Sequence, residues 1–372
     1  MENYIIKTRR ALHEIPESDW ELPETAAYIQ HELEDMGLSY RKINQTGFIV
    51  SIDCGKKDAK TYAFRADMDG LNVTEETEAE YGSRHPGKMH ACGHDGHMAM
   101  MLGFLRSIKG KELPCNVVAV FQPGEENVAG AGKFANEPEI LNSDAIFAIH
   151  LWTPLDSGKV SATAGARMAS ADRFSYRILG ESTHGGEPHR GIDPIPAAAA
   201  CVQAVQTYVS RRLDPNESAV ITIGRICGGT AYNVVAPYVD FSGTVRTFSP
   251  EIREEIQHWL DQTVSDIAKA YSCRCEGSWF FGPPAVINDE TAAAIAKKAA
   301  EEVMGKEALY DMPRVFGGED FALYQKHVPG CMMFLGAKTE DYYPHHHPKF
   351  NIDESVLEKG AAIFEKIVFS CS

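Results

Sequence analysis

Long apolar runs are missing from this 372-residue sequence, and none approaches the roughly 18 residues that a membrane-spanning helix needs. The first ten residues lack the apolar centre of a secretory signal and have the pattern of an amphipathic helix. Basic side chains are also few: 36 Lys and Arg stand against 52 Asp and Glu, which gives a net charge of −16. That charge argues against nucleic acid or an anionic membrane surface as a partner.

Cysteine shows no pattern of paired residues. Nine cysteines, an odd number, are scattered along the chain, so we expect reduced thiols in a cytoplasmic protein and no disulfide framework. Internal repeats and low-complexity tracts are absent as well. What is present is an ordinary globular composition, 44% hydrophobic and 24% charged, with a length that predicts two or three domains.

The first half of the chain alternates helical and strand patterns. Residues 22–36 place apolar side chains on one helical face, and a second such face begins near Gly96. Short apolar runs typical of buried strands occur at 48–52, 61–64, 117–121 and 145–149. Strands that alternate with helices predict an α/β fold built on a mostly parallel sheet.

A different pattern occupies residues 169–278. Its strands and helices follow the order β-α-β-β-α-β, which is the order of a ferredoxin-like unit. Both of its helices open with a capping residue followed by proline. The pattern of the first half resumes afterwards. We therefore predict a small α+β domain at 169–278, inserted into a larger domain formed by 1–168 and 279–372.

Residues suited to metal binding lie at strand ends and helix starts, where open α/β sheets place their sites. Cys92 and His94 are two residues apart, so both side chains point the same way in an extended stretch, and the helix that follows favours a thiolate. Glu125 and Glu126 come shortly after the apolar run 117–121. Because adjacent side chains diverge, one carboxylate can bind a metal while the other faces a water molecule.

Three further segments add ligands of the same kind. His150 ends the run 145–149, and three consecutive histidines, 345–347, lie near the C-terminus. Asp67 follows the run 61–64 and could orient a metal ligand through a hydrogen bond. Each alone is a weak signal, since a lone histidine at a strand end is more often structural and a histidine run can be a surface accident. Together the segments predict a metal centre built from several strand ends.

In order along the chain, these segments resemble the aminoacylase/carboxypeptidase family of di-metal metallopeptidases, in the branch of hippurate hydrolase, auxin-conjugate hydrolases and N-acetyldiaminopimelate deacetylase. The resemblance covers nearly the whole chain. Its motifs are Arg-Arg-Ala-Leu-His, Arg-Ala-Asp-Met-Asp, Met-His-Ala-Cys-Gly-His-Asp, Gln-Pro-Gly-Glu-Glu, Ser-Thr-His-Gly-Gly-Glu-Pro-His, Gly-Gly-Thr-Ala-Tyr-Asn, Gly-Thr-Val-Arg-Thr-Phe, Gly-Gly-Glu-Asp-Phe and His-His-His-Pro-Lys-Phe. It implies that the inserted domain is a lid that joins two subunits in a homodimer.

The resemblance also implies two divalent metal ions for each subunit. The matching ligands are Cys92, His94, Glu126, His150 and His346, with the Cys92 thiolate as the bridge between the ions. In the histidine run, the residue two positions before the proline has the family's ligand spacing, which selects His346 over its two neighbours. Thiolate and imidazole ligands suit Zn²⁺, and Mn²⁺, Co²⁺ and Ni²⁺ remain alternatives.

Five more positions match functional residues of the family. Glu125 matches the general base and acid, and Asp67 matches an acidic residue beside the metals. His184, Asn233 and Arg246 match residues of the inserted domain that hold the substrate, and the resemblance implies that His184 reaches the partner's site in the dimer. Arg246 and Asn233 would bind the carboxylate of the product amino acid, and His184 would stabilise the oxyanion.

This arrangement predicts a metal-dependent amidohydrolase that releases a free amino acid from an N-acyl (acetyl, benzoyl or similar) amino acid. Two metal ions can polarise the amide carbonyl and lower the pKa of a bound water. A di-metal dipeptidase or carboxypeptidase is the alternative that uses the same metal site. A thiol hydrolase built on Cys92 and His94 would survive chelators. A non-catalytic metal-binding dimer would have no use for both Glu125 and Asp67 beside its metals.

Overall fold

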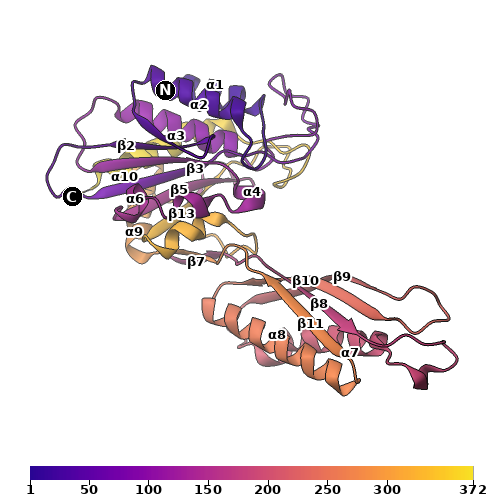
Figure 1. The fold of residues 1–372 in the computed structure, drawn as a ribbon. Coiled ribbons are helices and arrows are strands. Elements are labelled where there is room, and N and C mark those ends of the chain that lie inside the picture. Colours follow the sequence, from indigo (N-terminus) through magenta and orange to yellow (C-terminus); the bar gives the residue numbers. More distant parts are fainter. Residues whose placement is uncertain (372) are drawn as a thin grey trace. The chain divides into compact units, whose positions relative to one another are not determined.

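A computed structural model of the protein describes residues 1–371 and divides into two compact units (Figure 1). The first unit consists of Met1–Arg167, Ile287–Pro313 and Asp320–Ser372, and the second consists of Met168–Val286 and Arg314–Glu319. The sequence pattern placed the end of the inserted domain at residue 278. In the structure, the long segment of the second unit continues to Val286. Each unit has a hydrophobic core of its own.

The first unit is built from helices of very different length around one central sheet. Its helices are α1 (Glu2–His13), α2 (Pro23–Asp35), α3 (His94–Ile108), α4 (Glu125–Val128), α5 (Ala131–Phe134), α6 (Pro138–Leu141), α9 (Glu290–Met304) and α10 (Leu357–Phe369), with short 3-10 helices η3 (Lys306–Ala308), η4 (Asp320–Lys326) and η5 (Glu354–Val356). Its strands are β1 (Tyr40–Ile43), β2 (Gly47–Ile52), β3 (Thr61–Asp67), β4 (Asn116–Gln122), β5 (Ala145–Trp152), β6 (Val160–Ser161) and β13 (Gly330–Gly336).

The central sheet has the strand order β1-β2-β4-β3-β5-β13-β6. The four central strands β4, β3, β5 and β13 run parallel to one another. They are almost wholly buried because helices cover both faces of such a sheet. The outer strands pair antiparallel with their neighbours. The predicted α/β fold with a largely parallel sheet is confirmed.

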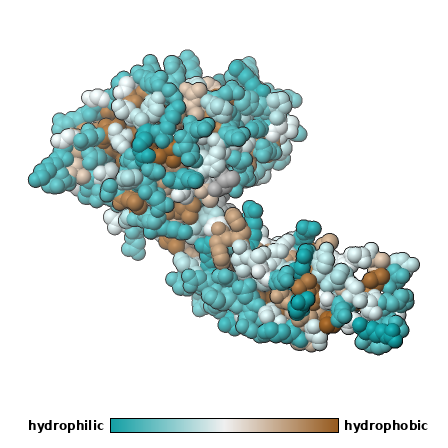
Figure 2. Space-filling view, in the orientation of Figure 1, coloured by the Kyte–Doolittle hydropathy of each residue, from teal (hydrophilic) through white to brown (hydrophobic). Residues whose placement is uncertain are grey.

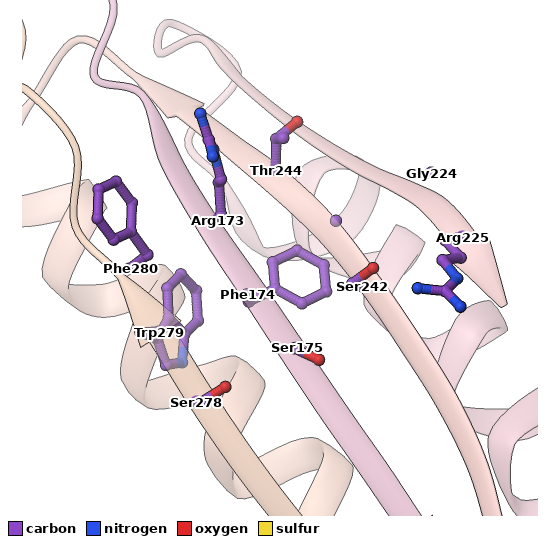
Figure 3. Close-up of a pocket in the computed structure, with 11 residues that line it drawn as sticks. Arg173, Phe174, Ser175, Gly224, Arg225, Ser242, Thr244, Ser278, Trp279 and Phe280 are labelled. Carbon is purple, nitrogen blue, oxygen red and sulfur yellow. The ribbon is translucent and has the colours of Figure 1, made fainter. Parts of the chain in front are cut away.

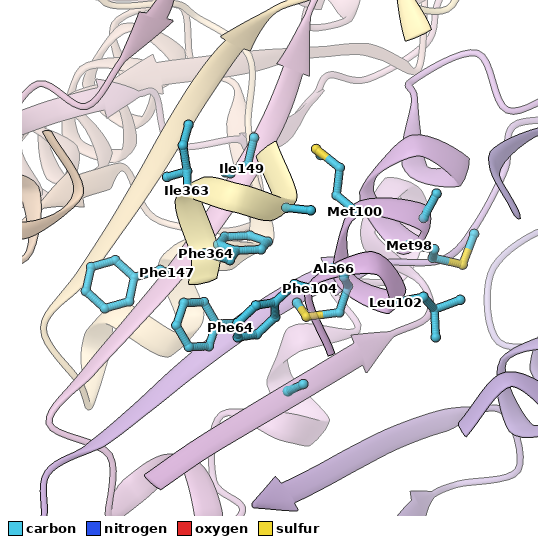
Figure 4. Close-up of a cluster of buried hydrophobic side chains, with 14 of the residues drawn as sticks. Phe64, Ala66, Met98, Met100, Leu102, Phe104, Phe147, Ile149, Ile363 and Phe364 are labelled. Atoms are coloured by element: carbon cyan, nitrogen blue, oxygen red, sulfur yellow. The ribbon is translucent and has the colours of Figure 1, made fainter. Parts of the chain in front are cut away.

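Helices α3 and α10 are joined to this sheet by a cluster of aromatic and aliphatic side chains (Figure 4). The rings of Phe64 on β3, Phe104 on α3 and Phe364 on α10 meet with centroids 4.8, 5.1 and 5.7 Å apart. All three side chains are buried, and each such burial contributes roughly 1.5–3 kcal/mol. The cluster fixes α3 against β3, so the first turn of α3 stays at the end of that strand.

The second unit is a four-stranded antiparallel sheet with two helices. Its elements are β8 (Asp172–Leu179), η1 (Pro188–Arg190), α7 (Pro194–Thr207), the π-helix η2 (Tyr208–Arg212), β9 (Ala219–Gly228), β10 (Tyr238–Thr247), α8 (Pro250–Ala270) and β11 (Arg274–Phe280). The strand order β11-β8-β10-β9 is that of a ferredoxin-like unit, as the sequence predicted. Asp193 and Ser249 cap α7 and α8 through their side chains, each followed by a proline.

Two short strands, β7 (Gly165–Met168) and β12 (Val286–Asn288), pair as a separate sheet. Within the described part of the chain, no helix is both long enough and apolar enough to cross a membrane. On the face drawn in Figure 2, hydrophobic residues are scattered among hydrophilic ones. All nine cysteines are free thiols.

Candidate metal centre

The candidate ligands and catalytic side chains of the first unit gather where parallel strands end. Strand β3 ends at Asp67, β5 carries His150 close to its end, and β4 leads into the turn that contains Glu125. Helix α3 begins at His94, beside the same edge of the sheet. Because the carboxyl ends of parallel strands share one edge, residues far apart in the sequence come together there.

Two triads of metal-type donors share one cysteine. The first triad is Cys92, His94 and His150, and the second is Cys92, Glu126 and His346, with the donor atoms of each triad within 4.8 Å of one another. The thiol of Cys92 lies 3.8 Å from Nε2 of His150, and Nε2 of His346 lies 3.4 Å from a carboxylate oxygen of Glu126. The structure thus brings together all five residues that the sequence analysis named as metal ligands.

The donor atoms and their charges fit divalent cations. Both ring nitrogens of His94 and one carboxylate oxygen of Glu126 are buried without a hydrogen-bond partner among residues 1–371. Burial alone would lower the pKa of His94, but the carboxylates of Asp67, Asp69 and Glu126 outweigh it and raise that pKa to about 10. Burial and the carboxylate of Glu126 raise the pKa of the Cys92 thiol. The pocket is therefore strongly negative, and a bound cation would reverse the effect on the thiol.

Of the three consecutive histidines, only the middle one faces the shared cysteine. His346 has a positive φ of 66°, and its N–H donates to the carbonyl oxygen of Ala91 at 2.8 Å. His345 points instead to the main-chain oxygen of Leu151 (3.0 Å), and burial lowers its pKa to about 4. The ring of His347 accepts a hydrogen bond from a nearby main-chain N–H and stacks on a tyrosine.

Glu125 lies at the edge of the metal centre, with a carboxylate oxygen 4.0 Å from Nε2 of His94. Its side chain is 11% exposed, so the carboxylate is accessible to a small molecule. The turn that carries it is fixed by Asp69, whose two oxygens accept the N–H groups of Glu125 (2.9 Å) and Glu126 (3.1 Å). Gly130 packs tightly against the main chain of this turn, and no other residue fits there, because a Cβ would lie 1.8 Å from a carbonyl oxygen of the turn.

Asp67 is completely buried and is held by a histidine ring and a guanidinium group. One carboxylate oxygen lies 2.6 Å from Nδ1 of His97, and the other accepts a hydrogen bond from Arg65 at 2.7 Å. Arg65 in turn contacts Asp320 at 2.7 Å. Burial would raise the pKa of Asp67, but His94, His97 and Arg65 together lower it well below its usual value. Asp67 therefore stays ionised, 3.6 Å from Nε2 of His94.

Two residues of this centre were not assigned by the sequence analysis. Asp69 holds the Glu125 turn and lies 3.7 Å from Nδ1 of His94, and His97 holds Asp67. The spacing of each residue from a predicted site residue is the signal that could have identified it. Asp69 is two residues from Asp67, and His97 is three residues from His94 on the same helix face.

The three predicted substrate-binding residues belong to the second unit. His184 and Asn233 lie on two neighbouring segments, joined by a bridge between His184 and Val234 and by the Gly185 N–H, which donates to the main-chain oxygen of Asn233 at 2.8 Å. Both are exposed. Arg246 lies near the end of β10, and its partial burial lowers its pKa.

A shallow hollow of about 450 Å³ lies on the sheet of the second unit (Figure 3). Its floor includes Ser278, Ser175 and Ser242, which the strand register places in one row across β11, β8 and β10. The guanidinium groups of Arg173 and Arg225 lie on either side of that row. None of the predicted site residues lines this hollow.

The sequence matches peptidase family M20/M25/M40 over residues 63–370. It is 37% identical over 364 residues to an N-acetyl-L-cysteine deacetylase of Bacillus subtilis (strain 168), covering 97% of this chain and 86% of the relative. It is 36% identical over 372 residues to an IAA-amino acid hydrolase of Arabidopsis thaliana (97% and 83%) and 34% identical over 363 residues to an N-acetyldiaminopimelate deacetylase of Halalkalibacterium halodurans (96% of each).

Among solved structures, a dinuclear metal-binding peptidase of the M20 family from Bacillus subtilis superimposes with a TM-score of 0.87. It shares 33% identity and covers 100% of this chain and 99% of its own. The family match spans well over half of the sequence, and these relatives span nearly all of it. The chain belongs to peptidase family M20/M25/M40 and is a hydrolase of amide bonds.

Proposed function

We propose that this hydrolase releases free amino acids from N-acyl amino acids with the help of two divalent metal ions. The observation that carries the proposal is the position of Cys92 in both donor triads, since this residue would then help to hold each of two ions. Relatives that are N-acetyl-amino-acid deacetylases and an amino-acid-conjugate hydrolase support the N-acyl substrate. A dinuclear metal-binding peptidase of the same family supports the number of ions.

The two triads divide the ligands between two sites. Cys92, His94 and His150 would hold one ion, and Cys92, Glu126 and His346 would hold the other. A set of one thiolate, three imidazoles and one carboxylate suits Zn²⁺, with Mn²⁺, Co²⁺ and Ni²⁺ as alternatives. When bound, the ions supply Lewis-acid polarisation of the amide carbonyl and lower the pKa of water.

The proton transfers fall to Glu125. Its carboxylate removes a proton from the attacking water, whose oxygen forms the new bond to the carbonyl carbon. The same carboxyl group then donates that proton to the amide nitrogen as the C–N bond breaks. The products are the carboxylic acid of the acyl group, which gives its proton to the released amine or to water, and the free amino acid. Asp69 keeps Glu125 in place through the main chain, and Asp67 orients the ring of His94 through its charge.

The second unit supplies the binding of the substrate. Arg246 presents a partly buried guanidinium group that can pair with the carboxylate of the amino-acid part, aided by Asn233. His184 would stabilise the oxyanion, in the site of a partner subunit within a symmetric homodimer. We expect the protein in the cytoplasm, and fractionation of cells tests this location directly.

The roles of the two adjacent glutamates can be separated by matched substitutions. Glu125→Gln should keep both metal ions and lower kcat by about 10²–10⁴-fold, which is the contribution of a general acid–base. Glu126→Gln should lower the metal content measured by inductively coupled plasma mass spectrometry. Metal loss from Glu125→Gln with retention in Glu126→Gln would mean that the two roles are reversed.

A substrate panel tests the class of amide bond. We expect N-acetyl and N-benzoyl amino acids to be cleaved by the metal-loaded protein with a higher kcat/KM than dipeptides of the same C-terminal amino acid. N-acyl amino acid amides, which lack the free carboxylate, provide the matched control. Faster cleavage of the dipeptides would favour the dipeptidase or carboxypeptidase alternative over the proposed activity.

A further inference from the structure

The main chain of Leu151, next to the proposed ligand His150, is hydrogen-bonded to three histidine rings. Its N–H donates to Nε2 of His97 at 2.9 Å. Its carbonyl oxygen lies 2.8 Å from Nδ1 of His150 and 3.0 Å from Nε2 of His345. The pairing between β5 and β3 ends at Ala148, three residues earlier, so side chains take over the hydrogen bonds at this strand end.

Each of these hydrogen bonds decides which ring nitrogen carries the proton. A carbonyl oxygen only accepts, so His150 is protonated on Nδ1 and His345 on Nε2. A main-chain N–H only donates, so Nε2 of His97 has no proton and Nδ1 carries it, facing Asp67 at 2.6 Å. In this tautomer Nε2 of His150 is an acceptor, and it lies 3.8 Å from the sulfur of Cys92.

We infer that His97 and His345 are positioning residues of the metal centre, which act through the main chain of Leu151 to hold the ring of His150 and the carboxylate of Asp67. The inference rests on the proposed function for the roles of His150 and Cys92 as ligands. His97 also lies close to donor atoms of Asp67 and His94. Both of its nitrogens are engaged by hydrogen bonds, however, so it serves to orient these donors.

Leu151 is a fixed anchor for this arrangement. A Cβ at Gly96 would lie 2.4 Å from its side chain, so the first turn of α3 rests directly on it. The ring of His345 also packs on Trp152, with centroids 4.6 Å apart. Helix α3 is therefore tied to the end of β5 by its side-chain contact with Leu151 and by the hydrogen bond from the Leu151 N–H to His97.

The tautomers can be measured in the metal-free protein. With ¹⁵N-labelled histidine, long-range ¹H–¹⁵N correlation spectra distinguish rings protonated on Nδ1 from rings protonated on Nε2, and single His→Gln variants assign the signals. At mildly alkaline pH we expect Nδ1–H for His97 and His150 and Nε2–H for His345. An Nε2–H tautomer for His97 would overturn the inference and leave the proposed activity untouched, because neither metal nor substrate is present.

A second experiment measures the consequence for metal binding, with Co²⁺ as the probe. His97→Leu keeps the apolar volume but removes both hydrogen bonds, and we expect it to lower the affinity for Co²⁺ by about 10- to 100-fold. The thiolate-to-Co²⁺ absorption bands should shift as well, because the ring of His150 is no longer held. His97→Gln, which retains one donor and one acceptor, should recover part of the loss.

Leu102→Ala in the same helix is the matched control, because Leu102 is fully buried in the core and is not among the donor groups. It should lower the thermal stability of the protein but leave the Co²⁺ affinity and spectrum unchanged. Wild-type affinity and spectrum for His97→Leu, or an equal change in Leu102→Ala, would overturn the inference. For His345, we expect a smaller loss in His345→Phe, and wild-type behaviour of that variant would remove His345 from the proposal.

Discussion

Asp69 provides the sharpest test of how the proton shuttle is held, because its carboxylate accepts two adjacent main-chain N–H groups. The distances are 2.9 Å to the N–H of Glu125 and 3.1 Å to that of Glu126. Asp69→Asn keeps the shape of the side chain but replaces one acceptor oxygen with an NH₂ group. That NH₂ would face an N–H, so one of the two hydrogen bonds is lost and two donors oppose each other.

The size of the effect follows from the lost hydrogen bond. A hydrogen bond to a charged group contributes about 1.5–3 kcal/mol. If this free energy is lost from the positioning of Glu125 in the transition state, kcat/KM falls by about 10- to 150-fold, at about 1.4 kcal/mol for each factor of ten. Asp69→Asn should still fold, since the substitution removes no buried apolar group. The assay is steady-state hydrolysis of an N-acetyl amino acid by metal-loaded protein of verified metal content.

Asp53→Asn is the matched control for Asp69→Asn. Asp53 also accepts a main-chain N–H, that of Gly55 at 2.7 Å, but in an exposed turn outside the donor groups. Its substitution should leave kcat/KM within about twofold of the wild type, as expected for a surface change. If fully metal-loaded Asp69→Asn keeps wild-type kcat/KM, or if Asp53→Asn loses as much, the assigned role of Asp69 is wrong.

Three further predictions concern the metals, the substrate carboxylate and the dimer. Removal of metal by a chelator should abolish activity and lower the thermal midpoint of unfolding in calorimetry. An ion at 100 times its Kd stabilises the folded state by about 2.7 kcal/mol, and this contribution is lost with the metal. Activity that persists in the chelator would favour a thiol enzyme. Arg246→Ala should lower kcat/KM for free-acid substrates far more than for their amides, and equal losses would refute the contact. When inactive His184→Ala and Glu125→Gln subunits are mixed, activity should return, because one of the two sites in each mixed dimer lacks both defects. If activity does not return although subunit exchange is proven, His184 acts in its own subunit's site or has no part in the mechanism.

The sequence predicted much of the fold because local patterns determine it. The predicted β-α-β-β-α-β order holds in the second unit, and the alternating burial of β10, Tyr238–Thr247, matches a sheet covered on one side. The two helix starts, each a capping residue followed by proline, were visible as well, because capping depends on adjacent residues. The antiparallel outer strands of the first sheet were not predicted. Their pairing joins residues that no local pattern relates, such as β2 with β4.

The same distinction applies to the metal centre, which consists of candidate ligands and of residues that orient them. The candidate ligands could be named because Cys92 and His94 form a short motif whose chemistry the sequence displays. Of the residues that orient them, Asp67 was named, whereas Asp69 and His97 were not, because their main-chain partners are distant in the sequence. Asp69 meets the main chain 56 residues away, and His97 meets that of Leu151 54 residues away. Only the folded chain shows which oxygen or nitrogen is used.

A second buried charge network ties the N-terminal helix to the metal centre. Arg9 on α1 contacts Asp95 at 2.8 Å, and Asp95 lies 2.7 Å from Nδ1 of His13, with all three side chains at most 2% exposed. Burying such charges costs several kcal/mol for each ion, so the pairing by itself is weak evidence for stabilisation. What it does fix is geometry, since Asp95 directly follows the proposed ligand His94 at the start of α3. The first helix of the chain thereby takes part in setting the position of that ligand, although none of its described side chains belongs to the donor groups.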